Sequence, residues 1–412
     1  MRLRHLLVIA ALIGCGSSSN DTDGKSAGSG SAAKPVPPTL KPTEIPIPIP
    51  KLNPGRAEAP PPATPPADPC PDKTGEECVN LGLYTENGTG GHEKNVSLAV
   101  ALFRAGCERK YPLGCAYLGD MLLDGKGATR DDAEAMRVYT IGCDAKIAVG
   151  CLGVGILFDR GQGVAQDDSK AFEYYEKACQ AGSKRGCVYT ADRQRDGNGT
   201  TKNLKGAIKN YTSACNGNEG LGCLGLGYQV EVGEGTPKDP KKAIALYQKA
   251  CEHKEPKGCG YWADLVETGK GARKDLVRAV ELNERGCLAG YYASCASAAV
   301  LYTKGDGGVT KNLERAVELA EMACTHSSGR GCHVRGWVLE LEDAPGGKDV
   351  GAAIPWFEKA CDLDYYEGCW AAGDLYHAGS ATRKNDAKAR KFLTKACDGN
   401  KHEKACAMLA KL

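Results

Sequence analysis

The cysteines of this chain constrain its fold more than any other feature. Twenty of the 21 cysteines form ten pairs, whose members lie eight residues apart, or nine in the last pair. Successive pairs begin 36 or 37 residues apart, and a period of this length is typical of repeat proteins. The repeat leaves no room for a separate enzymatic domain within residues 70–412. The pairs are Cys70 with Cys78, Cys107 with Cys115, Cys143 with Cys151, Cys179 with Cys187, Cys215 with Cys223, Cys251 with Cys259, Cys287 with Cys295, Cys324 with Cys332, Cys361 with Cys369 and Cys397 with Cys406.

Each period predicts two helices. After the second cysteine of a pair, a small residue stands four positions on, with apolar residues such as Leu118 and Leu122 three and seven positions on. This helical spacing ends at a Gly-rich turn such as 125–127, where glycine permits a left-handed cap. A second stripe follows, with Ala eight positions before the next cysteine in all nine periods and usually a bulky residue four positions before it. The fold class is therefore all-α, with units that stack into an α-solenoid.

The repeated blocks resemble a known family. KAFEYYEKAC, KAIALYQKAC and IPWFEKAC, the GxG turns and the 36-residue period resemble Sel1-like repeats, which are relatives of the tetratricopeptide repeats. A cysteine pair in every repeat resembles the Helicobacter cysteine-rich protein family. The resemblance covers residues 70–412 and implies a right-handed α-solenoid of about nine disulfide-stapled units. Two segments depart from it: 188–200 is polar where a helix should be apolar, and 340–349 replaces the GxG turn.

The cysteine pairs are predicted to form ten disulfides. Eight residues on one helix would separate two cysteines by about 12 Å, beyond disulfide reach. The spacers between them are turn-like, as in QAGSKRG, so the two cysteines of each pair should face each other across a helical hairpin. Zinc is the alternative, but the C-x7-C spacing and the aperiodic histidines disfavour it. No C-x-x-C occurs, so redox thiols are not expected, and neither a metal nor a cofactor is predicted.

The N-terminus has the pattern of an export signal. Arg2 and Arg4 precede the short apolar run 6–14, which is too short to span a bilayer. The sequence Leu12-Ile13-Gly14-Cys15 resembles a bacterial lipobox, which implies a signal peptide at 1–14 and a lipid on Cys15. An ordinary secreted protein with a stray cysteine is the alternative. In bacterial lipoproteins, an Asp after the lipidated cysteine marks retention in the inner membrane. This chain has Gly16 there, which favours the outer membrane, with the protein facing the periplasm or the cell surface.

The next 55 residues are predicted to be a tether. Residues 15–34 form a Gly/Ser-rich linker, and 35–69 hold 14 of the 21 prolines. At about 3.1 Å per residue, the Pro-rich part extends to roughly 100 Å. Removal of residues 1–14 takes away two of 53 basic residues and leaves 51 to balance 51 acidic ones. No basic field is left to attract nucleic acid, so nucleic-acid partners are not expected, and the membrane is contacted through the lipid alone.

Catalytic motifs are scarce. Members of the Helicobacter cysteine-rich family have been described as penicillin-binding or weakly β-lactamase-like, and serine β-lactamases use S-x-x-K, S-D-N and K-T-G. Here Ser31–Lys34 lies in the tether, Lys73-Thr74-Gly75 lies inside the first cysteine pair, and S-D-N does not occur. We interpret both matches as chance. The acidic pairs 131–132 and 167–168 fit helix N-termini, and the basic side chains of 184–209 are either a solvated face or a site for an acidic partner.

The sequence therefore predicts a lipid-anchored, monomeric binding scaffold without catalytic residues. Its concave surface, lined by the first helix of each repeat, would bind a protein, a peptide or a cell-wall ligand such as peptidoglycan. A β-lactamase-like or penicillin-binding activity and a purely structural spacer stay open as alternatives. Exposed aromatic residues would favour binding, although most of them could equally lie in the core. The candidates are Tyr228, Tyr261, Trp262, Tyr291, Tyr292, Trp370 and Tyr376.

Overall fold

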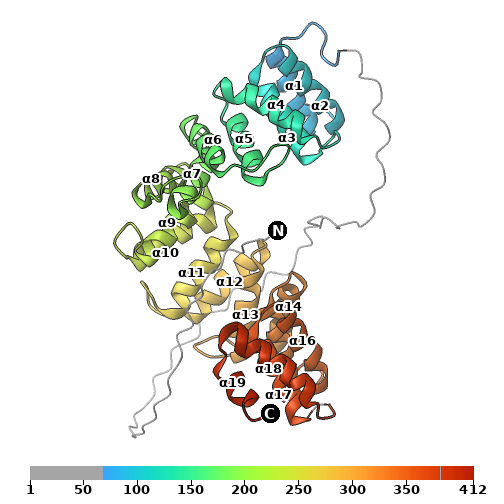
Figure 1. Cartoon of the computed structure of the whole chain (residues 1–412), viewed down its shortest axis with the longest axis vertical. Helices are drawn as coiled ribbons and strands as arrows, with labels where there is room; N and C mark the ends of the chain where they lie inside the picture. Colours follow the sequence, from blue (N-terminus) through green and yellow to red (C-terminus); the bar gives the residue numbers. More distant parts are fainter. Residues whose placement is uncertain (1–67, 381) are drawn as a thin grey trace, which may run out of the picture. The chain divides into compact units, whose positions relative to one another are not determined.

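The computed structural model describes residues 68–380 and 382–412. These residues form 19 α-helices and no strand, and each helix packs against the next in the chain (Figure 1). The predicted signal peptide, the lipid site at Cys15 and most of the tether lie outside the described residues. In the described part, none of the helices combines the length and the apolar character that a bilayer span requires. The predicted all-α class is confirmed.

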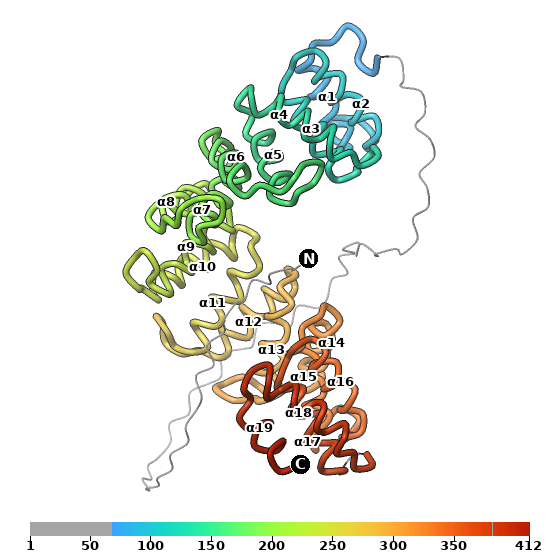
Figure 2. The backbone as a smooth tube through the Cα atoms, viewed as in Figure 1, coloured from blue at the N-terminus to red at the C-terminus, as the bar shows by residue number. Residues whose placement is uncertain are grey.

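The helices alternate between two kinds, which we call A and B (Figure 2). An A helix begins three residues before the second cysteine of a pair, and a B helix ends one residue after the first, except α18. The A helices are α1 (Gly75–Asn87), α3 (Pro112–Asp124), α5 (Ala148–Arg160), α7 (Lys184–Asp196), α9 (Gly220–Val232), α11 (Pro256–Thr268), α13 (Tyr292–Lys304), α15 (Gly329–Leu339), α17 (Tyr366–Ala378) and α19 (Glu403–Leu409). The B helices are α2 (Val96–Glu108), α4 (Asp132–Asp144), α6 (Asp168–Gln180), α8 (Leu204–Asn216), α10 (Pro240–Glu252), α12 (Leu276–Leu288), α14 (Leu313–Thr325), α16 (Val350–Asp362) and α18 (Asp386–Asn400).

Polar caps and glycines set these boundaries. Every B helix begins after an Asp or Asn whose side chain accepts a hydrogen bond from a backbone N–H of the first turn, as Asp131 does from Glu134 at 2.9 Å. Most A helices end at a left-handed glycine such as Gly125. The second glycine of the GxG turn is also left-handed, and a Cβ at Gly127 would lie 2.6 Å from the Val96 carbonyl oxygen. The turn therefore packs directly on the start of the preceding B helix.

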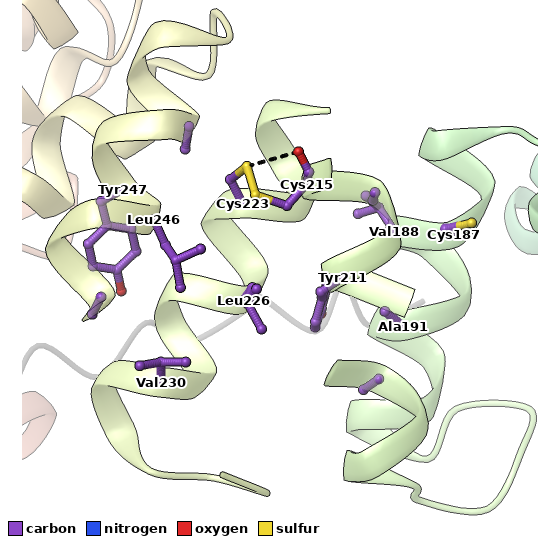
Figure 3. Close-up of a cluster of buried hydrophobic side chains, with 14 of the residues drawn as sticks. Cys187, Val188, Ala191, Tyr211, Cys215, Cys223, Leu226, Val230, Leu246 and Tyr247 are labelled. Atoms are coloured by element: carbon purple, nitrogen blue, oxygen red, sulfur yellow. Dashed lines mark hydrogen bonds between the residues drawn. A yellow bond between two sulfur atoms is a disulfide. The ribbon is translucent and has the colours of Figure 1, made fainter. Parts of the chain in front are cut away.

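The core lies between the helices of each repeat. The alanine eight positions before each cysteine is fully buried, and so are the tyrosine rings four positions before the cysteines of α4, α6, α8 and α10. Each of these rings faces the small A-helix residue four positions past a cysteine: a Cβ at Gly119 would lie 2.6 Å from the Tyr139 ring. Figure 3 shows this packing around Tyr211, Leu226 and Tyr247. The small column predicted from sequence thus makes room for aromatic rings.

Ten disulfides join the cysteine pairs, with Cα–Cα distances from 4.4 to 5.8 Å. Nine connect the end of a B helix to the following A helix, whereas Cys70–Cys78 ties the segment before α1 to α1. The second cysteine of every pair is the fourth residue of its A helix, so each bond holds the first turn of that helix. These cysteines are Cys78, Cys115, Cys151, Cys187, Cys223, Cys259, Cys295, Cys332, Cys369 and Cys406.

The chain between two bonded cysteines reverses through a residue with positive φ. This residue is Lys at 110, 146 and 254 and Gly at 182 and 290. The reversal brings the two cysteines of a pair together across a helical hairpin, as the turn-like spacers predict. Ten disulfides are typical of an oxidising, extracytoplasmic compartment.

The two atypical segments behave differently. The polar segment 188–200 still contributes residues 188–196 to a thirteen-residue A helix, α7. Its polar side chains find partners: Gln194 accepts a hydrogen bond from Asn210 at 3.0 Å, and Arg193 pairs with Asp159. In contrast, α15 has only eleven residues and ends at Leu339 without a left-handed cap. The missing GxG turn therefore shortens the helix, as the departure at 340–349 indicates.

Candidate functional site

One surface of the solenoid layer differs from repeat to repeat. The A helices contact one another across repeats, as α3 does α5 and α13 does α15, whereas no two B helices of the described residues contact each other as extensively. Five positions past the second cysteine, each A helix except the short α19 carries a side chain that is half-buried or exposed. We call this column the A-helix face. Its members are Leu83, Asp120, Ile156, Asp192, Tyr228, Asp264, Val300, Trp337 and Asp374.

A two-repeat alternation runs along this face. In α3, α7 and α11, Asp stands on the A-helix face and Tyr stands three positions before it, whereas α5 and α9 have Gly at that earlier position. The tyrosines pack at a tilt against the aromatic ring of the preceding B helix, as Tyr189 does against Tyr175 with 4.9 Å between centroids and 41° between the ring planes. Where glycine stands, the ring lies directly against the helix, and a Cβ at Gly153 would lie 2.6 Å from Tyr139. Alternate repeats therefore solve the same packing problem differently.

The buried tyrosines also donate to carboxylates. The Tyr139 hydroxyl donates to Asp120 at 2.6 Å, and the Tyr211 hydroxyl donates to Asp192 at 2.5 Å. Burial raises the pKa of both tyrosines, so their hydroxyls keep the protons that they donate. Burial also raises the pKa of Asp120 to about 6. A buried tyrosine hydroxyl therefore supplies a hydrogen bond to the carboxylates of both Asp120 and Asp192.

The same aspartate in α11 has lost its internal donor. At the position of Tyr139 and Tyr211, α12 carries Asn283, which is 1% exposed and whose Nδ2 has no hydrogen-bond partner. The shorter amide leaves the Asp264 carboxylate without a hydrogen bond or an ion pair in the described residues. Asp264 is exposed to solvent, but protein surrounds it on several sides. Burial, followed by the negative charge of Glu267, raises its pKa to about 6.

The structure places the other candidate residues in structural roles. Thr74 of the K-T-G match is the N-cap of α1 and forms a capping box with Glu77, while Ser31–Lys34 lies outside the described residues. Asp131 and Asp167 are N-caps, so a side-chain hydrogen bond adds to the predicted dipole effect. Both features stabilise helix ends.

The predicted aromatic residues need a correction. Only Tyr228, at 41% exposed, is clearly exposed. Five others are half-buried between helices, which the packing of the A helices against their neighbours explains. They are Tyr261, Trp262, Tyr291, Tyr292 and Trp370.

For Tyr376 the core alternative holds, and the side chain is not an exposed aromatic residue. Its side chain is 6% exposed, and its hydroxyl donates to Glu358 at 2.9 Å. The ring lies against Phe392 of the following B helix, with 5.9 Å between centroids. Tyr376 therefore belongs to the core between α17 and α18.

The basic segment 184–209 has partners within the protein. Arg193 pairs with Asp159 and Asp168, and Arg195 pairs with Asp192 and Asp196. Internal partners therefore neutralise much of this segment. Within residues 68–380 and 382–412, no group of three or more His, Cys, Asp or Glu side chains is arranged to hold a metal ion.

Asp264 was not among the predicted site residues, although the sequence carries a signal for it. The bulky column of the B helices has two small members, Asn283 and Ala320, in adjacent repeats. The alternation of Tyr and Asp at 117/120, 189/192 and 261/264 is likewise visible in the sequence. The sequence does not show that the B-helix column of Asn283 lies beside the A-helix column of Asp264. Only the packing of α11 against α12 shows this.

The fold and its periodic cysteines define an α-solenoid of disulfide-linked helix pairs. The model of the Sel1 repeat matches residues 78–111, 112–145, 148–183, 186–219, 221–254, 256–291, 293–328, 342–365 and 367–401. These matches cover more than half of the chain, so the chain belongs to the Sel1 repeat family. Such a scaffold indicates a role in protein–protein interaction. No curated protein sequence matches the chain.

Solved structures share the fold. A protective antigen of uropathogenic Escherichia coli strains that displays an SLR fold has 22% identity and a TM-score of 0.62, over 79% of this chain and 69% of that one. A Sel1 repeat protein from Oxalobacter formigenes has 21% identity and a TM-score of 0.54, over 60% and 96%. Cysteine-rich protein B of Helicobacter pylori is 32% identical over 32% of this chain and 94% of that one, with a TM-score of 0.27.

Proposed function

We propose that this protein is a lipid-anchored, extracytoplasmic scaffold that binds a protein, a peptide or a cell-wall ligand along its A-helix face. The observation that carries the proposal is the variation of this face: Ile156, Tyr228, Asp264 and Trp337 occupy one structural position in different repeats. A spacer needs no such variation, whereas recognition of an irregular ligand does. Side chains that lack an internal partner are the ones available to that ligand.

The disulfides support a rigid recognition surface. Nine of the ten close a short loop between consecutive helices, and on the chain-entropy model such a loop contributes roughly 2–3 kcal/mol. A surface that is already ordered loses less conformational entropy when it binds. Rigid repeats therefore suit a binding role in the compartment that the disulfides indicate.

The anchor is the second part of the proposal. Cys15 would carry the lipid, and the residues after it would hold the repeats away from the membrane. Mass spectrometry of the protein from its native membrane is expected to give a chain that begins at Cys15, carries a diacylglycerol and has no free thiol. A Cys15→Ser variant is expected to remain uncleaved. A secreted, lipid-free chain would contradict the anchor and leave the scaffold intact.

No observation favours a catalytic role. Thr74 of the K-T-G match is a helix cap whose hydroxyl bonds to Glu77, and S-D-N does not occur. Incubation of the purified chain with a chromogenic β-lactam is expected to give no turnover. Turnover that disappears on reduction of the disulfides would establish an activity that this proposal does not contain.

Affinity capture tests the scaffold directly. The full chain with its disulfides is expected to retain a specific envelope protein or peptidoglycan fragment, which mass spectrometry would identify. Reduced and alkylated protein is the control, because it keeps the composition and loses the ordered surface. Equal retention by the two forms, or retention of nothing, would overturn the proposal.

A further inference from the structure

We number the repeats from α1–α2, so that repeats 5 to 7 comprise α9 to α14. These repeats carry a group of carboxylates and tyrosines that we call the Asp264 patch. Its acidic members come from α9 and α11, and its tyrosines come from the same helices and from the residue just before α13. Asp264 and the exposed Tyr228 belong to the A-helix face, and the other members are half-buried. The patch consists of Tyr228, Glu231, Tyr261, Asp264, Glu267 and Tyr291.

The electrostatic effects among these groups are those of neighbouring side chains. After burial, Asp264, Tyr228 and Glu231 are the causes that raise the pKa of Tyr261. The pKa of Tyr291 rises to about 12, chiefly through burial and then through Tyr261 and Asp264. The packing agrees, because a Cβ at Gly260 of α11 would lie 2.6 Å from the Tyr291 ring. Tyr291 therefore lies against the helix that carries Asp264.

The patch is open because of a single change in the repeat. In repeats 2 and 4 the B-helix tyrosine reaches the aspartate of the A-helix face and uses its hydroxyl to satisfy it. Asn283 stands at the same position in the repeat, and its side chain is several atoms shorter than that of tyrosine. Its Nδ2 is buried without a partner, and the Asp264 carboxylate is left to solvent. Both groups lack the bonds that their equivalents make.

The charge of the patch also lacks compensation. No Lys or Arg nitrogen of the described residues lies within 4.0 Å of a carboxylate oxygen of Glu231, Asp264 or Glu267. Glu231 accepts a hydrogen bond from the Tyr247 hydroxyl at 2.7 Å, which leaves its negative charge in place. The cation that most affects Asp264 is Arg330 of α15, which instead donates to Ser297 at 2.9 Å. The patch is thus a net negative site flanked by aromatic rings.

Some acidic residues at related positions do have cationic partners. Glu86, at the end of α1, pairs with Lys126, and Asp159, at the end of α5, pairs with Arg193. The solenoid therefore supplies its own cation to some of these carboxylates, although not, within the described residues, to Glu340 at the end of α15. At the Asp264 patch an external cation can take the place of the missing partner.

We propose that the Asp264 patch binds the alkylammonium group of a lysine side chain in an extended, basic segment of the partner protein. A carboxylate held among protein groups pairs more strongly with an ammonium than one in open water. Tyrosine rings contact the methylene stem and attract the cation through their faces. The inference rests on the proposed scaffold function and names the chemistry that one part of its surface recognises.

The test uses the full chain and hexalysine with blocked ends as the probe. Isothermal titration at low ionic strength is expected to show binding, which is lost with the same peptide acetylated on every lysine. Asp264→Asn is expected to weaken hexalysine binding roughly tenfold or more. The matched control is Asp120→Asn, which removes the same charge from the same helix position, where Tyr139 already occupies the carboxylate. This control is expected to change binding by less than about twofold.

The outcomes separate this inference from the scaffold proposal. Equal losses in the two variants would show attraction to overall charge and would overturn the patch. Binding of acetylated hexalysine, or no binding of hexalysine, would overturn it as well. Asp264 is exposed, so thermal melting of the variant is expected to match the parent and to exclude unfolding as a cause. If Asp264→Asn retains the partner captured from the envelope at parental level, the scaffold stands and the patch is not its ligand site.

Discussion

Repeats 2 to 5 and repeats 6 to 7 fill the space between their helices in different ways. In the first group a fully buried tyrosine of the B helix fills it, as Tyr211 does in α8. In the second group Asn283 and Ala320 stand in its place. Ala263 and Ala299 are the small A-helix residues of this second group, whereas in the first group three repeats have glycine there and the repeat of Tyr211 has Ala191. In repeats 6 and 7 a smaller B-helix residue is therefore combined with alanine on the A helix. In repeat 6 the Asp264 carboxylate, to which a tyrosine would donate, becomes available.

The largest expected effect comes from removing an aromatic ring. Tyr211→Ala deletes a side chain with no exposed surface and is expected to lower the free energy of unfolding around α8 by about 3–5 kcal/mol. Asn283→Ala, in the smaller core, is expected to cost less than about 1 kcal/mol, because the buried Nδ2 makes no hydrogen bond. Hydrogen exchange of α7–α8 and α11–α12 measures both locally. Equal costs would show that the two groups of repeats do not differ in the way we describe.

The second effect comes from overfilling the same contact. A Cβ at Gly119 would lie 2.6 Å from the Tyr139 ring, so Gly119→Ala is expected to destabilise α3–α4 by about 1–3 kcal/mol despite its better helix propensity. The physical reason is the clash, so the cost is expected to shrink when Tyr139→Ala is added. A double-mutant cycle measured by chemical denaturation gives this coupling. Strict additivity would mean that glycine is present for another reason.

The third effect is the pH dependence of binding at Asp264. The Asp264 carboxylate, whose pKa is raised to about 6, loses its charge as pH falls, so hexalysine binding is expected to weaken roughly tenfold between pH 7.5 and 5. The charged groups around it are Glu231 of α9, Glu267 of α11 and Arg330 of α15, and the raised pKa of Tyr261 and Tyr291 keeps both tyrosines protonated. Titration calorimetry across this range checks the prediction. Asp264→Asn should remove most of the dependence, and a slope that persists in this variant would assign it to the glutamates.

The repeat architecture could be predicted from sequence because its signals are local. Cysteine spacing, left-handed glycines and the fully buried alanine column each reflect the backbone of one helical hairpin, and nine copies reinforce each other. The role of the small column could not be predicted in the same way. Gly119 meets Tyr139 twenty residues later only when two helices pack, and the sequence shows the two columns without showing that they touch.

The candidate site was harder to predict because it is an exception to the repeat. Asn283 and Asp264 are ordinary polar residues in isolation, and they become informative only when compared with Tyr139–Asp120 and Tyr211–Asp192. The exposure of aromatic residues was also beyond the sequence, as Tyr376 shows: its position on α17 points inward, and its hydroxyl donates to Glu358. A repeat pattern predicts what recurs, whereas a binding site is defined by what does not recur.

The smallest expected effect concerns the disulfide turns, where the two groups of repeats are alike. The residue that reverses the chain has positive φ in each turn, and it is Lys at 254 but Gly at 290. The left-handed conformation costs a non-glycine residue about 1 kcal/mol, so Lys254→Gly is expected to stabilise its hairpin by somewhat less than that, since glycine also gains freedom in the unfolded chain. The reverse change, Gly290→Lys, is expected to destabilise by a similar amount, because open space around Gly290 leaves backbone strain as its main effect. Thermal melting of the two variants under oxidising conditions measures this pair of shifts. Shifts of the same sign would show that side-chain contacts, and not backbone conformation, decide the stability of these turns.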